Sequence, residues 1–145
     1  MKILILNGPN LNMLGLREPH IYGNQTYADL EAKIHAFCAQ NQIEYRMMQT
    51  NHEGVLVDEI QAAWGQYDGI VINPAAYTHT SIALLDALKA VGLPAVEVHI
   101  SDVTQREDFR QRSFVRAACL HTVCGKGLDG YCEAIAFLQH YLQEK

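Results

Sequence analysis

Cysteine, long apolar runs and positive charge are all scarce in this sequence, and each shortage excludes a class of protein. The four cysteines show no Cys-x-x-Cys spacing and lie in apolar segments, so free thiols are expected rather than disulfides or a zinc site. No apolar run approaches the roughly 18 residues of a membrane span, and the run at residues 3–6 is too short for a signal peptide. We therefore expect a cytoplasmic protein without membrane segments.

The charge balance argues against nucleic acid as a partner. Eleven lysines and arginines stand against 16 aspartates and glutamates, which gives a formal net charge of −5. A surface that binds nucleic acid needs the opposite sign to neutralise phosphates. Repeats and low-complexity segments are absent as well. Residues 1–145 are expected to form one domain, too short for a (β/α)8 barrel of about 250 residues.

What the sequence does contain is a regular alternation of short apolar runs and longer amphipathic stretches. The apolar runs predict five strands, at residues 2–6, 43–49, 69–72, 95–100 and 119–124. Helices are predicted at residues 26–40, 54–64, 80–91, 109–116 and 128–143. Strands that are apolar throughout and alternate with helices indicate a parallel sheet covered on both faces. We expect an α/β protein, a three-layer flavodoxin-like fold with a five-stranded sheet in the order 2-1-3-4-5.

Two details refine the expected helices. Thr26 is a suitable N-cap for the first of them. In the helix at residues 54–64, the apolar residues Val55, Ile60, Ala63 and Trp64 are expected to form the buried stripe.

Polar residues gather where such a fold binds its ligands, beyond the carboxyl ends of the strands and beside the switch point between the first and third strands. The connection at residues 7–25 far exceeds the roughly 2–6 residues usual between a strand and a helix, which is typical of a lid or binding loop. Residues 73–81 are rich in polar side chains and precede a helix, whose free amides favour an anion. Glu97 and His99, two apart on a strand, share one face.

The residues alone leave other interpretations open. His99 can be a structural histidine bonded to Glu97, and these two with His79 can be read as a metal site, although no metal-binding motif surrounds them. The glycines at residues 125–130 match Gly-x-Gly-x-x-Gly. A dinucleotide site also needs a following strand and an acidic residue about 20 positions on, and both are missing. We interpret these glycines as turn and helix-packing residues.

Six segments carry a resemblance to a known family. They are Gly8-Pro9-Asn10-Leu11-Asn12 through Leu14-Gly15, Arg17-Glu18-Pro19 with Tyr22-Gly23, Asn51-His52-Glu53-Gly54, Asn73-Pro74-Ala75-Ala76-Tyr77-Thr78-His79-Thr80-Ser81, Glu97-Val98-His99-Ile100-Ser101, and Gly125 to Tyr131. In this order, and over almost the full length, the sequence resembles the type II dehydroquinases, the 3-dehydroquinate dehydratases. That family has the flavodoxin-like fold that the strand and helix pattern predicts.

The resemblance implies a trans elimination of water from 3-dehydroquinate through an enolate, without cofactor, imine or metal. Tyr22 matches the base that removes the C2 proton, and Arg17 the cation that favours its tyrosinate and closes over the substrate. Asn10 matches the residue that holds a water at the enolate oxygen. His99 matches the acid that protonates the leaving hydroxyl, with Glu97 orienting it or raising its pKa.

The resemblance also implies the binding residues and the assembly. The substrate carboxylate is assigned to Asn73 and the backbone amides at residues 100 and 101, which are Ile100 and Ser101, and the ring hydroxyls to His79 and Arg110. Asp86 matches a residue that reaches the neighbouring subunit's site in a homododecamer of four trimers. One departure is Asp102, where the family commonly has Asn, so an extra negative charge is expected to weaken substrate binding.

Two rival functions share the expected fold. A hydrolase would use Cys119 or Ser81 as nucleophile, but neither lies in a nucleophile elbow. A non-catalytic flavin-binding or phospho-receiver module would need a phosphate loop or an acidic cluster after the first strand, where the sequence reads Asn7-Gly8-Pro9-Asn10. The sequence does not separate a role in aromatic biosynthesis from one in quinate breakdown.

Overall fold

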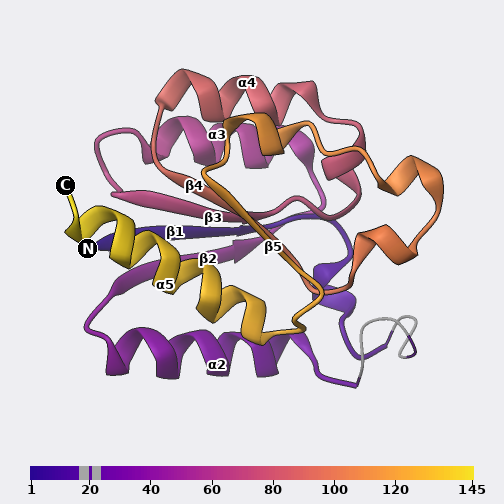
Figure 1. Ribbon diagram of the computed structural model, residues 1–145, viewed down its shortest axis with the longest axis horizontal. Helices are drawn as coiled ribbons and strands as arrows, with labels where there is room; N and C mark the ends of the chain where they lie inside the picture. Colours follow the sequence, from indigo (N-terminus) through magenta and orange to yellow (C-terminus); the bar gives the residue numbers. More distant parts are fainter. Residues whose placement is uncertain (17–19, 21–23) are drawn as a thin grey trace.

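A five-stranded parallel sheet runs through the centre of the computed structural model, which describes residues 1–16, 20 and 24–145. The strands lie in the order β2-β1-β3-β4-β5, which confirms the flavodoxin-like order expected from the sequence (Figure 1). Their bounds are β1 Lys2–Asn7, β2 Glu44–Gln49, β3 Gly69–Asn73, β4 Ala95–His99 and β5 His121–Cys124. Every pair of neighbours is parallel.

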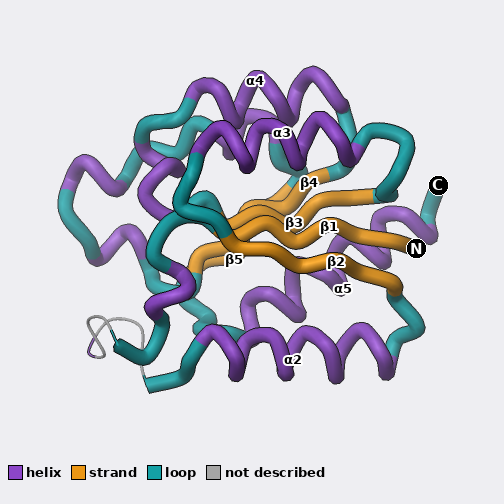
Figure 2. The backbone as a smooth tube through the Cα atoms, turned by 180° about the vertical axis from the view of Figure 1, so that it is seen from behind, coloured by secondary structure: helices purple, strands orange, loops and turns teal. Residues whose placement is uncertain are grey.

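Helices cover both faces of this sheet (Figure 2). Helices α2 (Tyr27–Gln40) and α5 (Asp129–Gln143) pack on one face, and α3 (Glu53–Ala63) and α4 (Ile82–Val91) on the other. The alternation of side chains along β4 follows this division. Val96 and Val98 join the core beneath α2 and α5, whereas Ala95 joins the core beneath α3 and α4. Among the described residues, no helix combines the length and apolar character needed to cross a membrane.

Helix α2 begins as the sequence predicts. The Thr26 hydroxyl accepts a hydrogen bond from the backbone N–H of Asp29, and the Asp29 carboxylate accepts one from the Thr26 N–H, which forms a capping box. The four cysteines are free thiols, as expected.

The buried stripe predicted for α3 is partly wrong. Ile60 and Ala63 are buried, but their partner is Leu56, while Val55 is 37% and Trp64 71% exposed. Residues 56, 60 and 63 follow the helical spacing of four and three, which puts Leu56 on the core face and turns its neighbour Val55 away.

The helix predicted at residues 109–116 is also wrong. The segment holds two short 3-10 turns, η4 (Asp108–Arg110) and η5 (Val115–Ala118), joined by non-helical chain. The backbone groups between them bond elsewhere: the Arg112 carbonyl accepts from His79, and the Phe114 N–H donates to the Thr78 carbonyl. Tertiary contacts therefore take the hydrogen bonds that a helix would need.

The carboxyl ends of β1 and β3 approach each other closely. The Gly8 N–H donates to the Asn73 carbonyl at 2.8 Å, and a Cβ atom at Gly8 would lie 2.3 Å from the Pro74 carbonyl oxygen. Only glycine fits this approach, which brings the loop after β1 against the loop after β3.

Candidate active site

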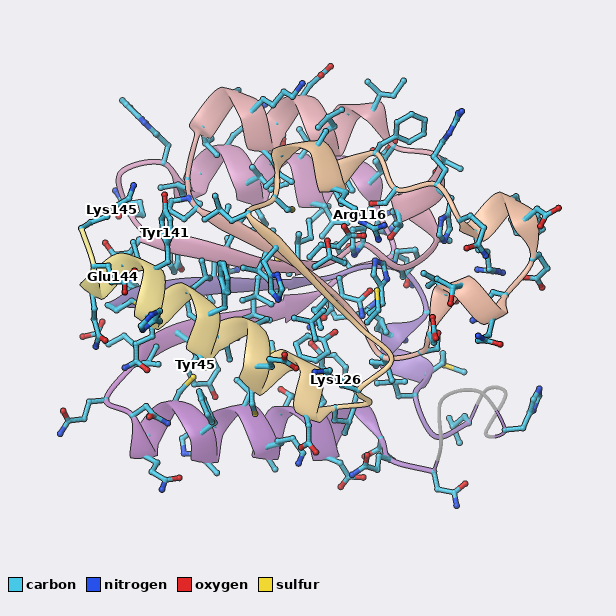
Figure 3. The ribbon with its side chains drawn as sticks, in the orientation of Figure 1. Tyr45, Arg116, Lys126, Tyr141, Glu144 and Lys145 are labelled. Atoms are coloured by element: carbon cyan, nitrogen blue, oxygen red, sulfur yellow. The ribbon has the colours of Figure 1, made fainter. Side chains whose placement is uncertain are left out.

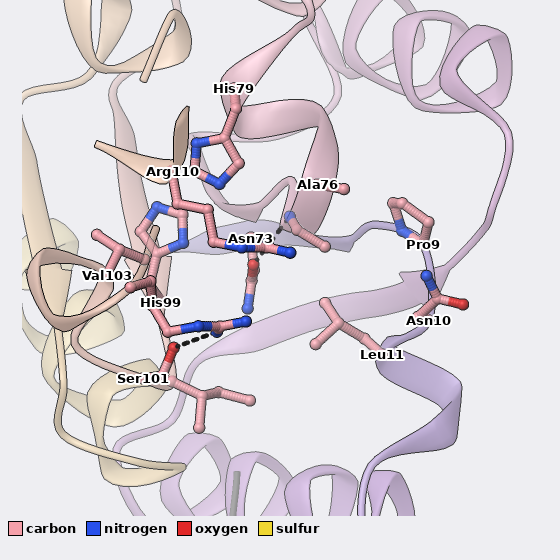
Figure 4. Close-up of a pocket in the computed structure, with 13 residues that line it drawn as sticks. Pro9, Asn10, Leu11, Asn73, Ala76, His79, His99, Ser101, Val103 and Arg110 are labelled. Atoms are coloured by element: carbon pink, nitrogen blue, oxygen red, sulfur yellow. Dashed lines mark hydrogen bonds between the residues drawn. The ribbon is translucent and has the colours of Figure 1, made fainter. Parts of the chain in front are cut away.

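A cavity of about 210 Å³ opens at the carboxyl edge of the sheet, where β1, β3 and β4 end (Figure 4). The loops after these three strands line it, together with η4. The lining residues are Pro9, Asn10, Leu11, Asn73, Ala75, Ala76, His79, His99, Ile100, Ser101, Val103, Arg106 and Arg110. The cavity therefore lies where the topology of the sheet predicts a ligand site.

A buried pair of ionisable groups borders this cavity. Glu97 is 0% exposed, and its Oε2 atom lies 2.5 Å from Nε2 of His99, which is 5% exposed. Both side chains lie on one face of β4, as the spacing of two predicts. The geometric expectation for this pair is confirmed.

Glu97 accepts hydrogen bonds from four side chains. Besides His99, its carboxylate receives Ser113 Oγ at 2.8 Å, Thr122 Oγ1 at 3.3 Å, and Arg116 through Nε at 3.0 Å and Nη2 at 3.3 Å. Arg116 lies on η5 (Figure 3), and Thr122 faces Glu97 across the β4–β5 ladder. All four side chains donate, which suits an ionised carboxylate because such a group can only accept hydrogen bonds.

These hydrogen bonds keep the Glu97 carboxylate ionised behind His99. Burial alone would raise the pKa of Glu97, but the hydrogen bonds from His99, Arg116 and Ser113 outweigh it and lower the pKa to about 2. Because an ionised carboxylate only accepts, the short contact fixes the proton on Nε2 of His99. The remaining ring nitrogen, Nδ1, is the one that can exchange a proton with a ligand.

His79 presents a neutral ring to the cavity. Its Nδ1 donates to the Arg112 carbonyl oxygen at 2.7 Å, so Nε2 is the acceptor of the ring. Burial lowers the pKa of His79, and the nearby His99 and Arg110 lower it further, against the effect of that hydrogen bond. The imidazole can therefore accept a hydrogen bond from a ligand hydroxyl at neutral pH.

Two arginines give the cavity its positive charge. Arg110 donates from Nε to Glu107 at 2.6 Å, and Arg106 contacts Ser101 Oγ through Nη1 at 3.5 Å. Figure 4 shows Arg110, His79 and His99 reaching into the space around Asn73. Asn73 is 3% exposed and accepts the Ala75 N–H on its Oδ1 at 3.1 Å. The cavity thus combines guanidinium and amide donors and suits an anionic ligand.

The candidate residues named from the sequence fall into three groups. The cavity brings together His99 with Glu97 behind it, and the residues Asn10, Asn73, His79, Ile100, Ser101 and Arg110. Asp86 lies on the exposed side of α4, outside this lining. Arg17 and Tyr22 lie outside the described residues.

Sequence reasoning missed the residues that support the pair on β4. Ser113 and Arg116 come from an irregular segment, which no periodic pattern marks. Thr122 could have been found, because the parallel register of β4 and β5 sets it opposite Glu97. Arg106 also lines the cavity, although the sequence analysis assigned only Arg110 of this segment to the site.

One alternative interpretation of the sequence was a metal site formed by His79, Glu97 and His99. In the part of the chain that is described, no group of three or more His, Cys, Asp or Glu side chains could hold a metal ion.

The glycine-rich segment is a turn: Gly125 and Gly127 have positive φ angles of 74° and 61°. Their N–H groups donate to the carbonyls of His99 and Ile100, which ties this turn to the end of β4.

Comparisons with known proteins agree on one family. Residues 1–139 match the family model described as dehydroquinase class II. A 3-dehydroquinate dehydratase from Geotalea daltonii is 50% identical over 144 residues, which cover 99% of this chain and 100% of the relative. A 3-dehydroquinate dehydratase from Clostridium acetobutylicum is 48% identical over 144 residues, which again cover 99% of this chain and 100% of the relative. The crystal structure of a type II dehydroquinase from Butyrivibrio crossotus superposes with a TM-score of 0.94 at 50% identity, covering 96% of this chain and 97% of that one.

Proposed function

Since the chain belongs to the class II dehydroquinase family, we propose that its cavity binds 3-dehydroquinate and that the protein removes water from it to give 3-dehydroshikimate. The reaction is that of a hydro-lyase and fits the dehydration step of the shikimate pathway. One observation in the structure carries the proposal: a buried histidine–carboxylate pair, His99 with Glu97, borders a cavity lined by two arginines. A proton donor thus lies beside a site for an anion.

His99 is the general acid in this proposal. Its Nδ1 gives a proton to the departing C1 hydroxyl, which leaves as water, while the Nε2–H stays bonded to Glu97. The ionised Glu97 accepts the Nε2–H of His99 and fixes the orientation of the ring. Glu97 therefore acts through His99 and does not touch the substrate.

Tyr22 is the general base, and Arg17 is its partner. Removal of the C2 proton by the Tyr22 phenolate gives an enolate, and loss of the C1 hydroxyl then completes the double bond. A phenol has an ordinary pKa of about 10, so a neighbouring cation such as Arg17 is needed to favour the phenolate at neutral pH. Asn10, at the cavity wall, holds the water that stabilises the enolate oxygen.

The remaining residues bind the substrate. Asn73 and the backbone amides at Ile100 and Ser101 take the carboxylate, which the positive charge of Arg106 and Arg110 attracts. His79 accepts from a ring hydroxyl through Nε2, since its Nδ1–H is bonded to the Arg112 carbonyl. Arg110 donates to a second hydroxyl.

The assay that tests this function follows the ultraviolet absorbance of the conjugated enone after 3-dehydroquinate is added. Parallel samples contain a chelator, or borohydride together with the substrate. Turnover that survives both treatments is the expected result, because the proposed route uses neither a metal nor an imine. Loss of turnover on chelation or reduction, or none from the folded protein, would contradict it.

The base and its partner are tested by substitution. Tyr22→Phe and Arg17→Ala are expected to lower kcat by several orders of magnitude and to leave the thermal unfolding temperature nearly unchanged. A variant with near-normal kcat would remove that residue from the mechanism.

The proposal extends to assembly and location. A single catalytic domain over residues 1–145 is supported by the family match over residues 1–139. We propose a homododecamer of four trimers, supported by the exposed position of Asp86 on α4, from which it can reach a neighbouring subunit. A monomer by light scattering at working concentration would contradict the assembly. The free thiols support a cytoplasmic location, where thiols stay reduced.

A further inference from the structure

A chain of hydrogen bonds between buried side chains runs from the interior to Asn73. The amide Nδ2 of Asn73 donates to the Tyr131 hydroxyl at 2.9 Å, and that hydroxyl donates to Asn7 Oδ1 at 2.6 Å. Asn7 Nδ2 lies 3.4 Å from the hydroxyl of Tyr27. Asn7 and Tyr131 are 0% exposed, and Asn7 pairs in register with Asn73 on the neighbouring strand. The chain therefore links α5 to the ends of β1 and β3.

The direction of this chain is set by its chemistry. A phenol has one hydrogen, and Tyr131 uses it on Asn7, so its oxygen must accept from Asn73. At the other side of the same amide, Asn73 Oδ1 accepts the backbone N–H of Ala75, a group that can only donate. Both contacts require the same orientation of the Asn73 amide. Turning it over would break two buried hydrogen bonds at once.

This orientation decides what Asn73 offers to a ligand. Its oxygen is occupied by Ala75, and one of its two amide hydrogens by Tyr131. The second amide hydrogen remains for the cavity that Asn73 lines. A donor is what a carboxylate oxygen requires, whereas the reversed amide would present an oxygen and repel it.

We propose that Tyr131 is a positioning residue, which holds the Asn73 amide so that it donates to the carboxylate of the substrate. The inference rests on the proposed function, because it takes 3-dehydroquinate as the ligand. Burial raises the pKa of the Tyr131 phenol above its usual range, so the hydroxyl keeps its proton throughout the working pH range. Tyr131 itself does not line the cavity and acts only through Asn73.

The test compares wild-type enzyme with Tyr131→Phe, Asn73→Ala and the double variant, in steady-state turnover of 3-dehydroquinate. Tyr131→Phe is expected to raise KM roughly tenfold, because the buried Asn73 amide loses its acceptor and one of the two contacts that fix its orientation. The value of kcat should change by less than about threefold, since the hydroxyl does not touch the reacting atoms. In the Asn73→Ala background, adding Tyr131→Phe should leave KM unchanged, because no amide remains to be oriented.

Tyr45→Phe is the matched control. Tyr45 also packs against the core beneath α2, and its hydroxyl contacts His35, away from the cavity. This variant should keep the wild-type KM. Should Tyr131→Phe fail to fold, Asn7→Ala tests the same chain, because Tyr131 without that acceptor can donate to Asn73 and turn its amide. The same rise in KM is then expected.

Calorimetric binding of quinate, a carboxylate with a similar ring, separates the inference from the proposed function. If wild-type enzyme binds quinate but does not turn over 3-dehydroquinate, the proposed function fails, and the inference is judged from the Kd for quinate in the same set of variants. An unchanged KM or Kd in Tyr131→Phe would overturn the inference. So would an equal effect of Tyr131→Phe with and without Asn73, since that indicates a general loss of structure.

Discussion

Nε2 of His99 lies 2.5 Å from Oε2 of Glu97, two residues earlier on β4, and the carboxylate is fully buried. A buried charge is stable only when its partners compensate for the lost hydration. Here Ser113 donates to the same oxygen as His99, Thr122 donates to the other oxygen, and Arg116 donates to both. The acid of the proposed reaction therefore depends on groups that never meet the substrate.

The buried carboxylate makes stability depend on pH in a defined window. The pKa of Glu97 is about 2 in the folded protein and near its ordinary value of about 4.3 when unfolded. Because the folded value is the lower one, the stabilisation is fully present above pH 5 and is lost as the pH falls towards 2. The difference in unfolding free energy between wild-type protein and Glu97→Gln should narrow by about 2 kcal/mol between pH 7 and pH 3.

Urea unfolding at fixed protein concentration measures this difference. Glu133→Gln, which removes an exposed carboxylate paired with Lys126, is the control and should show a nearly constant difference across the same range. A constant difference for Glu97→Gln as well would contradict the low pKa.

Arg116 should affect turnover although it does not line the cavity. Arg116→Met keeps the length of the side chain but removes two hydrogen bonds to Glu97, so the carboxylate holds His99 less firmly. We expect kcat to fall about tenfold, with KM within about twofold of wild type. Arg112→Met is the control, because only the backbone carbonyl of Arg112 contacts His79. Equal kcat values in the two variants would show that Arg116 has only a structural role.

The contact between the loops after β1 and β3 should not tolerate a methyl group. Gly8→Ala would put a Cβ atom 2.3 Å from the Pro74 carbonyl oxygen, and both segments border the cavity. Unfolding should become easier by about 1–3 kcal/mol, and KM should rise as the loops move apart. Gly54→Ala is the comparison, because a Cβ atom at this position in α3 would meet no packed neighbour within 4 Å. This variant should stabilise the protein by up to about 1 kcal/mol. Equal stability of the two variants would refute the close approach.

Asp102→Asn tests whether a negative charge near the cavity weakens substrate binding. Its Oδ1 accepts the Thr104 N–H at 3.0 Å and the Thr104 hydroxyl at 2.6 Å, contacts that an asparagine oxygen can retain. Asp102→Asn therefore removes a negative charge beside Ser101 and keeps the turn. KM should fall by at most about threefold or stay level, and any fall should disappear in high salt. Asp58→Asn, on α3, serves as the distant control, and a clear rise in KM for Asp102→Asn would contradict the charge argument.

The sheet was predictable because its three inner strands, β1, β3 and β4, are mostly apolar and buried, a pattern typical of a parallel sheet covered on both faces. The segment at residues 109–116 was not, because its backbone hydrogen bonds go to His79 and Thr78, residues far away in the sequence. Local pattern describes which helices are possible, and such distant partners decide which ones form. Val55 is a different case, because the helical spacing of the buried residues puts Leu56, and not Val55, on the core face of α3.

The site was predictable to the extent that its residues lie on regular elements. Alternation along a strand placed Glu97 beside His99, and the ends of β1, β3 and β4 meet at the cavity as the topology requires. Tyr131 carried no such signal, because an aromatic residue at helical spacing is typical of a core. Its role depends on one hydroxyl and two amides that only the fold brings together.

The bond between Tyr131 and Asn7 spans 124 positions of the sequence. During synthesis, β1 leaves the ribosome long before α5 exists, so a nascent chain that already has Asn7 and Asn73 still lacks the hydroxyl between them. The side-chain amides of Asn7 and Asn73 are then bonded to water until α5 docks on the sheet. The N-terminal strands can therefore form before the cavity has all its hydrogen bonds. We expect an incomplete nascent chain to bind no substrate.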